Sequence, residues 1–331
     1  MKDFCIVGSG VAGSTIAKLL YKKYSVEVFD KARGPGGRAA NRKYKNKISF
    51  DHGLQFITPK QSSFKKFLNF LKNIRVIKEW NGNHLDFNFE KKKKSIKFIG
   101  FKSNNDISKY QLRDIKSKYL TKITHIKYNS NYWTITINKK EKVYFKNLIL
   151  TCPLPQLKEL AKKYLYKKLT NIKIDIAPNI TVMAVYKNYM KLPINSIKFK
   201  DNTLGFASNE NSKKRFKSKL STWTLQANED FSNKYIDKYK KNKKKVINIM
   251  LKRFQDKVGF KIKDLVFADI HGWKYAYRKK TKVDLNSFWI TKYNLGVCAD
   301  WMLGAKAENA WLSAKNLFEK IKKNPPEKRR V

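Results

Sequence analysis

The sequence predicts a mixed α/β fold in which a parallel, Rossmann-type unit carries an inserted unit of a different kind. Three observations lead to this prediction. Residues 4–30 have the pattern of strand, glycine turn, helix and strand. Residues 148–151 are continuously apolar, as in the central strand of a parallel sheet. Residues 171–286 show alternating stretches that favour a largely antiparallel α+β domain, and residues 288–300 return to the texture of buried strands.

The first forty residues have the order of elements found in dinucleotide-binding units. A short apolar run at 4–7 leads into the glycine turn G-S-G-V-A-G at 8–13. An amphipathic stretch at 14–23 predicts a helix, and a second strand at 26–29 ends in Asp30. In such units the phosphates of the nucleotide lie at the N-terminus of the helix, where free N–H groups and a partial positive charge meet them.

Each glycine of this turn has a separate physical role. Gly8 permits the tight turn, Gly10 lets the backbone approach a pyrophosphate, and Gly13 lets the helix pack closely on the strand. Asp30 follows Gly8 by 22 residues, near the spacing of an acid that accepts hydrogen bonds from ribose hydroxyls. Without these flanking elements, the motif would indicate only a glycine turn with no ligand.

A second glycine cluster narrows the choice of cofactor. Residues 31–38 have the sequence K-A-R-G-P-G-G-R directly after the acid. Gly36 and Gly37 permit close approach of the backbone, and the forked guanidinium groups of Arg33 and Arg38 suit phosphate oxygens. An acid followed by such a loop is typical of flavoproteins of the glutathione-reductase-like superfamily. The alternative interpretation is a basic surface turn.

Composition limits the class of protein. The 331 residues have room for two domains, and no run of 18 apolar residues predicts a membrane span. Three distant cysteines, Cys5, Cys152 and Cys298, are interpreted as buried thiols of a reducing compartment, so we expect a cytoplasmic protein. The four histidines have no metal-ligand spacing, and we expect no metal site.

The net charge of +49 invites a nucleic-acid interpretation. However, the 74 basic residues comprise 64 Lys and only 10 Arg, and the lysines are spread along the whole chain. A selected nucleic-acid surface more often clusters its charge and uses more Arg. We therefore interpret the charge mainly as a compositional bias, although it would still attract an anionic small substrate.

Further elements follow from hydrophobic periodicity. Helices are predicted at 64–74, 106–117, 233–254 and 305–322. A hairpin is predicted from strands at 76–80 and 84–89, and a three-strand meander from 123–128, 132–137 and 143–151. The inserted unit has predicted strands at 180–186, 196–199, 204–207 and 222–227, and the chain returns to the first unit with strands at 288–291 and 295–300.

The predicted domain organisation is discontinuous. Segments 1–75, 98–172 and 286–324 form the cofactor domain, segments 76–97 and 173–285 form the substrate domain, and 325–331 is a disordered tail.

Taken together, the motifs resemble the renalase-like branch of the flavin amine oxidase superfamily, over nearly the whole chain. The segments that carry the resemblance are 8–13, 29–38, 51–56 (D-H-G-L-Q-F), 148–156, 297–303 and 308–313. Three positions depart from the family pattern, because Ala299, Asn309 and Ala314 stand where the family usually has glycine. An extra side chain there could loosen the cofactor.

The resemblance implies a two-domain FAD fold of the p-hydroxybenzoate-hydroxylase-like kind and noncovalent FAD. It implies an oxidase that converts 2- or 6-dihydro isomers of NAD(P)H to NAD(P)⁺, with O₂ as acceptor and H₂O₂ as product. One alternative is an oxidase of small amines. Another is a flavin-binding interaction protein without turnover. The oligomeric state and the choice between NAD and NADP forms stay open.

The resemblance also implies site residues. As cofactor contacts we predict Gly8, Gly10, Val11, Ala12, Gly13, Asp30, Lys31, Arg33, Gly36, Gly37, Arg38, Gln55, Phe56, Ile126, Asp300, Glu308 and Ala310. As residues of the substrate face we predict Gln55, Trp223, Gln226, Trp273 and Tyr275. Trp273 and Tyr275 are two apart on a predicted strand, so they point the same way and could wall a flat ring, although core packing is the alternative. For His271 a structural hydrogen bond is expected.

Overall fold

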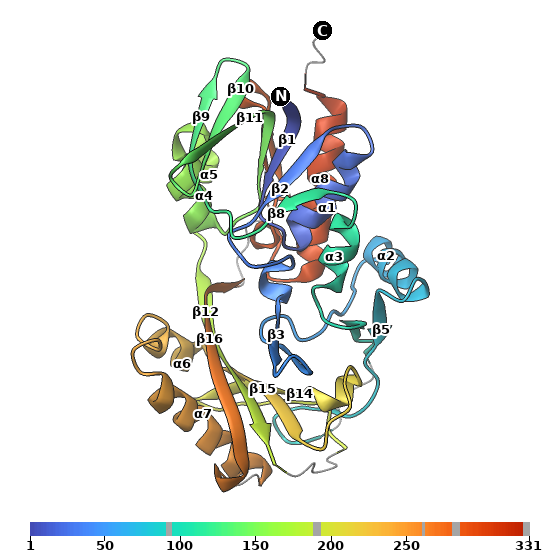
Figure 1. Ribbon diagram of the computed structural model, residues 1–331, viewed down its shortest axis with the longest axis vertical. Helices are drawn as coiled ribbons and strands as arrows, with labels where there is room; N and C mark the ends of the chain where they lie inside the picture. The colour runs from blue at the N-terminus through green and yellow to red at the C-terminus, as the bar shows by residue number, and fades with distance from the viewer. Residues whose placement is uncertain (91–94, 188–192, 260–261, 280–284, 327–331) are drawn as a thin grey trace.

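Two sheets lie at the two ends of the long axis of the computed structural model, and the long strands β12 (Ile176–Tyr186) and β16 (Leu265–Arg278) of one sheet extend toward the other (Figure 1). The structure describes residues 1–90, 95–187, 193–259, 262–279 and 285–326. The mixed α/β class with a Rossmann-type unit, predicted from the sequence, is confirmed.

The larger sheet is parallel at its centre. Its strands run in the order β17 (Phe288–Ile290), β18 (Leu295–Val297), β11 (Glu141–Leu150), β1 (Lys2–Val7), β2 (Val26–Phe29) and β8 (Lys116–Lys118). Every neighbouring pair from β18 to β8 is parallel, and β17 is antiparallel to β18. Leu148, Ile149 and Leu150 are fully buried, as their continuously apolar run predicts.

Both faces of this sheet are covered. On one face pack α1 (Val11–Tyr21) and α8 (Ala307–Lys323), with α3 (Asp106–Leu112) beside α1. The meander is formed as predicted, because β9 (Ile123–Asn129) and β10 (Tyr132–Ile137) pair antiparallel with β11. The helices α4 (Leu154–Ala161) and α5 (Lys167–Asn171) add to the core under the meander.

The second sheet is mostly antiparallel. Its order is β16, β12, β15 (Ser221–Ala227), β14 (Leu204–Asn209), β13 (Ser196–Lys198) and β6 (His84–Leu85). The helices α6 (Glu229–Tyr235) and α7 (Lys243–Val258) pack on one face, where Trp223 and Phe254 meet in the core. The other face receives the hairpin of β3 (Asn41–Tyr44) and β4 (Ile48–Asp51), so this hairpin lies between the two sheets.

The predicted hairpin at 76–89 is wrong. The strand β5 (Ile77–Glu79) pairs with β7 (Phe98–Gly100), and β6 pairs parallel with β13 instead. The side chain of Asn195 explains this arrangement. Its Oδ1 accepts from the Asn83 N–H at 3.1 Å and its Nδ2 donates to the Asn81 carbonyl at 3.0 Å, so the turn segment is tied to β13.

Two predicted helices differ from the prediction. The helix predicted at 106–117 ends at Leu112, because residues 116–118 pair with β2 as β8. The helix predicted at 233–254 is two helices: α6 begins at Glu229, where the Asn228 side chain accepts from the Phe231 N–H, and α7 begins at Lys243. The lysine-rich segment between them is unfavourable for one continuous helix, because like charges repel at helical spacing. Of the predicted tail, residues 327–331 lie outside the described residues.

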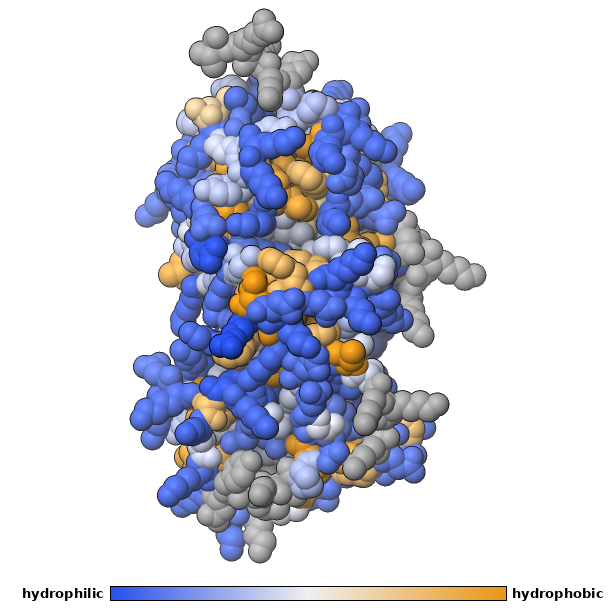
Figure 2. Space-filling model, turned by 90° about the vertical axis from the view of Figure 1, so that its right-hand side faces the viewer, coloured by the Kyte–Doolittle hydropathy of each residue, from blue (hydrophilic) through white to orange (hydrophobic). Residues whose placement is uncertain are grey.

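Polar side chains dominate the face of the molecule that Figure 2 shows. Figure 2 shows one face of the molecule, which is hydrophilic over most of its area, with apolar side chains gathered near its middle. On α2 (Ser62–Asn73), Phe70 is 49% exposed, whereas Phe64, Leu68 and Leu71 are buried. None of the helices in the described residues is both long enough and apolar enough to span a bilayer.

Candidate cofactor and substrate site

The turn between β1 and α1 is built around Gly8 and Gly13. Gly8 has φ +106° and donates its N–H to the Phe29 carbonyl at 2.8 Å. A Cβ atom at Gly13 would lie 1.9 Å from the carbonyl oxygen of Gly8, so only glycine fits at this helix–strand contact. The helix α1 begins at Val11 with Gly10 as N-cap, no side-chain cap and no acid in its first turn. The N–H groups of this turn are therefore available to an anion.

Asp30 lies beside this turn, as its spacing predicts. Its Oδ2 accepts from the Ser9 N–H at 2.7 Å and from the Ser9 hydroxyl at 2.6 Å. Its Oδ1 accepts from the Ala32 N–H at 2.8 Å. The carboxylate thus links the end of β2 to the glycine turn, and its oxygens retain lone pairs that ribose hydroxyls could use.

The second glycine cluster packs directly on the first. Gly36 donates its N–H to the Ser9 carbonyl at 2.9 Å and forms a bridge with Gly10. Gly36 has φ +117°, and a Cβ there would lie 2.4 Å from the Cβ of Asn105. Lys31 and Arg33 are exposed at the rim. Where the two loops meet, Gly10, Gly36 and Gly37 present only backbone, as a cradle for a phosphate chain requires.

Arg38 connects this cradle with the closing motif. Its Nη2 donates to Asp300 Oδ1 at 2.6 Å, and its Nη1 donates to the Ala276 carbonyl in β16 at 2.8 Å. Asp300 begins the short 3-10 turn η6 (Asp300–Met302) after β18 and is buried. The sequence placed both residues among the cofactor contacts, and the structure brings them together.

The other predicted cofactor contacts differ in their surroundings. Glu308 is buried, and its Oε1 accepts from the backbone N–H groups of Lys60 and Gln61 at 2.9 and 2.7 Å. It therefore holds the loop before α2 against α8. Ala12 and Ala310 pack between α1 and α8, with Val11 against the same core, whereas Ile126 is 1% exposed in the core under the meander.

The three departures from the family pattern are accommodated. Ala299 is buried in the core, and its N–H donates to the Ser313 hydroxyl at 3.1 Å. Ala314 is fully buried, and Asn309 donates to the Gly304 carbonyl at 2.9 Å. Their effect on cofactor affinity stays a prediction.

The candidate substrate face forms where the loop of residues 52–56 lies on the second sheet. Trp273 Nε1 donates to the His52 carbonyl at 2.7 Å, and its ring stacks on the His52 imidazole with centroids 5.2 Å apart. Gln226 Nε2 donates to the Gly53 carbonyl at 2.7 Å. Tyr275 is half-buried two residues along β16.

Two histidines accompany Trp273. Burial, with further contributions from His271 and Arg42, lowers the pKa of His52 to about 3. Burial, followed by the charge of Arg42, lowers the pKa of His271 to about 4. Their rings meet edge to face with centroids 4.8 Å apart. Both imidazoles are therefore neutral at pH 7, so this part of the site carries no histidine charge.

The assignment of Trp223 to the substrate face is wrong. Trp223 is 1% exposed and packs against Phe254 of α7, with ring centroids 5.0 Å apart. Side chains alternate along a strand, so Trp223 and Gln226, three residues apart in β15, must point to opposite faces. Only Gln226 faces the loop.

Gln55 also differs from its prediction. It is only 5% exposed, and its side chain bonds within the loop and to Lys213. Its Nε2 donates to the carbonyls of Asp51 and Gly53, and its Oε1 accepts from Lys213 at 3.4 Å. The neighbouring Phe56 is half-buried among Trp80, His84 and Phe206, at centroid distances of 6.0 to 6.5 Å.

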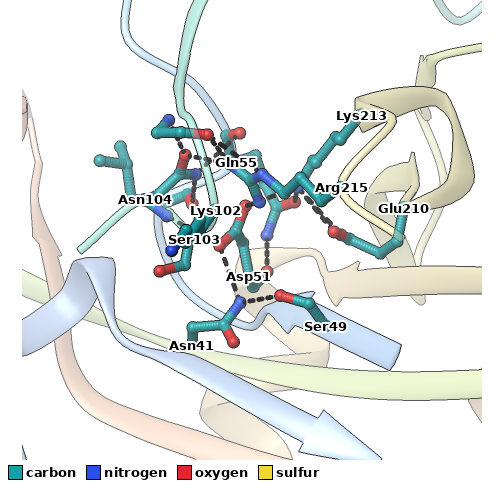
Figure 3. Close-up of polar contacts among 12 residues, drawn as sticks. Asn41, Ser49, Asp51, Gln55, Lys102, Ser103, Asn104, Glu210, Lys213 and Arg215 are labelled. Atoms are coloured by element: carbon teal, nitrogen blue, oxygen red, sulfur yellow. Dashed lines mark hydrogen bonds and ion pairs between the residues drawn. The ribbon is translucent and has the colours of Figure 1, made fainter. Parts of the chain in front are cut away.

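Gln55 belongs to a buried ion cluster that the sequence analysis missed (Figure 3). The side chains of Asp51, Glu210 and Lys213 are fully buried and that of Arg215 is 1% exposed. Lys213 Nζ lies 2.9 Å from Asp51 Oδ2 and 2.9 Å from Glu210 Oε2, and Arg215 Nη1 also donates to Asp51. The only sequence signal was Asp51 in the loop motif, because nothing separates Lys213 from the other lysines.

The cluster shifts the two carboxyl groups in opposite directions. Burial alone would raise the pKa of Asp51, but the charges of Lys213 and Arg215 outweigh it and lower the pKa to about 2. Burial, only partly offset by Lys213, raises the pKa of Glu210. Asp51 is therefore the fixed negative charge to which both basic side chains are held.

Comparisons with known proteins agree with this architecture. Residues 6–71 match the model of the NAD(P)-binding Rossmann-like domain. The chain is 28% identical to renalase from Mus musculus over 178 residues, which are 48% of this chain. The match spans about half of the renalase chain, 49% of its length.

Solved structures show the same fold over nearly the whole chain. A candidate protoporphyrinogen oxidase from Exiguobacterium sp. 255-15 has a TM-score of 0.75 at 10% identity, with 98% of this chain and 99% of that chain covered. Cyclohexylamine oxidase from Brevibacterium oxydans IH-35A has a TM-score of 0.71 at 9% identity, with 98% and 99% covered. The predicted resemblance to renalase is thus found over about half of the chain, and the solved structures show the fold over nearly all of it.

Proposed function

We propose that this protein is an FAD-dependent oxidase that converts 2- or 6-dihydro isomers of NAD(P)H to NAD(P)⁺. The observation that carries the proposal is the cradle of the two glycine loops, closed by Asp30 on one side and by the Arg38–Asp300 pair on the other. Through Ala276, Arg38 ties this cradle to β16, the strand of Trp273. A redox cofactor in the cradle would thus lie near an aromatic wall.

The residues present fit FAD. A Cβ built at Gly10 would meet only Gly36 and Gly37, at 3.9 Å, so the backbone is bare at the helix N-terminus, where a pyrophosphate would lie. Asp30 would hold the ribose of the adenosine half, and Arg38 with Asp300 would hold the other half. When bound, FAD would accept two electrons from the substrate and pass them to O₂.

Noncovalent binding is supported by the state of the cysteines. Cys5 and Cys298 are fully buried, and burial raises the pKa of both thiols well above the usual range. Burial also raises the pKa of Cys152 to about 12. Since the thiolate is the nucleophile, none of these groups is prepared to form a bond to the flavin ring at pH 7.

The substrate proposal rests on a reaction that needs no acid or base from the protein. Oxidation of a dihydronicotinamide follows NAD(P)H + O₂ + H⁺ → NAD(P)⁺ + H₂O₂, and the ring becomes an aromatic pyridinium without a protein base. The residues beside Trp273 suit this reaction, because His52 and His271 are neutral and weakly basic. Trp273 and Tyr275 would hold the flat ring in place, which is the main requirement for such a transfer. The net charge of +49 favours an anionic dinucleotide.

Oxidation of small amines is the second candidate. The fold shared with cyclohexylamine oxidase favours it. A third candidate, a flavin-binding interaction protein without turnover, would bind FAD but show no reduction by either substrate class.

Anaerobic flavin bleaching distinguishes the three candidates. The purified protein would be mixed in stopped flow with 2- and 6-dihydro isomers of NAD and NADP, with ordinary 4-dihydro NADH, and with a panel of amines. We expect fast bleaching by the 2- and 6-dihydro isomers alone. Bleaching by amines but not by these isomers would favour the amine oxidase, and no bleaching at all would favour the interaction protein.

A further inference from the structure

The buried ion cluster holds both ends of the loop that carries His52 and Gly53. At its start, Asp51 accepts from Lys213 at 2.9 Å and from Arg215. At its end, Lys213 lies 3.4 Å from the Oε1 of Gln55. Because Lys213 and Arg215 follow β14 of the second sheet, the loop after β4 is fixed by side chains that come from the second sheet (Figure 3).

Arg215 reaches further than its ion pair. Its Nε and Nη2 donate to the Gly100 carbonyl at 3.1 and 2.9 Å, and Nη2 also donates to Asn104 Oδ1 at 2.9 Å. Asn104 in turn donates to the carbonyls of Leu54 and Gln55 at 2.6 and 3.0 Å. One guanidinium group therefore acts on the loop directly at its start and through Asn104 at its end.

The backbone of the same loop receives the candidate substrate-facing side chains. Trp273 donates to the His52 carbonyl and Gln226 donates to the Gly53 carbonyl, both at 2.7 Å. The loop thus lies between the ion cluster and these two side chains. A shift of the loop would move both acceptors and, with them, the indole and the amide.

We infer that Lys213 and Arg215 are positioning residues, which fix the loop of residues 52–55 and thereby set Trp273 and Gln226 for the substrate. This inference rests on the proposed function for its effect on the reaction, but the effect on the loop can be measured without a substrate. A buried ion network is a costly way to gain stability, since desolvation offsets much of the attraction. Its directional hydrogen bonds are better suited to fixing geometry.

The experiment compares variants of the full chain in its FAD-bound form. Arg215→Lys keeps the charge beside Asp51 but loses the fork that reaches Gly100 and Asn104. Glu210→Gln combined with Lys213→Met removes one positive and one negative group together and leaves the Asp51–Arg215 pair. Leu251→Ala serves as a control for general loss of stability, because Leu251 lies on the buried side of α7, on the face of the second sheet opposite the loop.

The first measurement is hydrogen exchange of backbone amides by mass spectrometry. We expect exchange to rise about tenfold or more in the peptides of residues 50–58 and 269–277 in both cluster variants, but not selectively there in Leu251→Ala. The second is anaerobic reduction by a 2- or 6-dihydro isomer, where the limiting rate should fall about tenfold while the FAD absorption band stays unchanged. Trp273→Phe removes the donor to the His52 carbonyl. In the Trp273→Phe background, Arg215→Lys should therefore lower the limiting rate by a smaller factor than it does in the parent.

Each result decides the inference. Unchanged exchange in both peptides would overturn it, and so would a loss of protection that Leu251→Ala reproduces at equal stability. Faster exchange in these peptides together with unchanged reduction kinetics would overturn the link to Trp273 and Gln226. If the parent protein is not reduced by any dihydronicotinamide, the proposed function fails, whereas the exchange arm still shows whether the cluster fixes the loop and β16.

Discussion

Arg38 and Asp300 are 262 residues apart in sequence and form an ion pair of 2.6 Å. The first belongs to the second glycine loop and the second to the turn after β18. The Nη1 atom of the same guanidinium donates to the Ala276 carbonyl in β16. One side chain thus connects the start of the chain, its closing motif and the strand of Trp273.

Arg38→Lys should test this connection. A lysine keeps the positive charge but lacks the planar fork whose Nη1 and Nη2 reach Ala276 and Asp300. Loss of one hydrogen bond to a charged group corresponds to about 1.5 kcal/mol or more, so FAD affinity should fall about tenfold or more. Fluorescence titration of the apoprotein with FAD measures this affinity. Arg75→Lys is the matched control, because Arg75 is exposed and is not among the predicted cofactor contacts, and an equal loss in both variants would contradict the role given to Arg38.

Gly13→Ala should abolish the cradle. The new methyl group would lie 1.9 Å from the Gly8 carbonyl, so helix α1 must move away from β1. We expect a loss of stability of about 2 kcal/mol or more, as for overpacked cores, together with loss of bound FAD. Urea unfolding and the absorption spectrum of the purified protein report the two effects. Gly34→Ala is the control, since no atom lies within 4 Å of its added Cβ, and it should bind FAD normally.

Asp30→Ala should weaken FAD binding. The carboxylate is the acceptor predicted for the ribose hydroxyls, and the structure adds that it also holds the Ser9 and Ala32 N–H groups. A hydrogen bond to a charged group contributes about 1.5–3 kcal/mol, so affinity should fall about ten- to a hundredfold. Equal FAD affinity of Asp30→Ala and the parent in a titration would reject the assignment.

The sequence predicts those parts of the site that depend on local geometry. The glycine turn, Asp30 and the meander need only neighbours in sequence, and their patterns follow from strand and helix periods. The Asn195 contact that replaces the predicted hairpin joins residues more than a hundred apart, and no local pattern marks it. Lys213 is likewise hidden among 64 lysines, although it is fully buried. Trp223 could have been placed correctly, because its spacing from Gln226 puts the two on opposite faces of a strand.

Acid should destabilise the protein through His52. Its pKa is about 3 in the folded protein, against about 6.5 for an unperturbed histidine. The unfolded chain therefore binds a proton as the pH falls through about 6.5, whereas the folded chain does so only near 3. The contribution of His52 to the free energy of unfolding is fully present above about pH 6.5 and is lost as the pH falls toward 3. Between pH 7 and pH 5 this loss is about 2 kcal/mol.

His52→Leu, which has no titrating group, isolates this effect. Urea unfolding at pH 7 and pH 5 should show a smaller loss in the variant than in the parent. His271, whose pKa is lowered to about 4, contributes in the same direction but is present in both proteins. Asp51 does not interfere, because its pKa is held at about 2. Equal pH dependence of parent and variant would show that His52 is not buried in its neutral form.

The two faces of β15 should separate stability from reaction. Trp223 is in the core against Phe254, so Trp223→Ala should cost about 3–5 kcal/mol of stability, as for other large-to-small core changes. Below its unfolding transition, this variant should keep the parent's limiting rate of anaerobic flavin reduction.

Gln226→Ala removes only the amide that donates to the Gly53 carbonyl at the edge of the candidate substrate face. It should leave stability within about 1 kcal/mol of the parent, the typical value of one hydrogen bond, and lower the limiting rate. Urea unfolding and stopped-flow reduction of both variants provide the comparison. If Trp223→Ala slowed reduction while Gln226→Ala did not, the substrate would lie on the α7 side of the sheet, and the site proposed here would be on the wrong face.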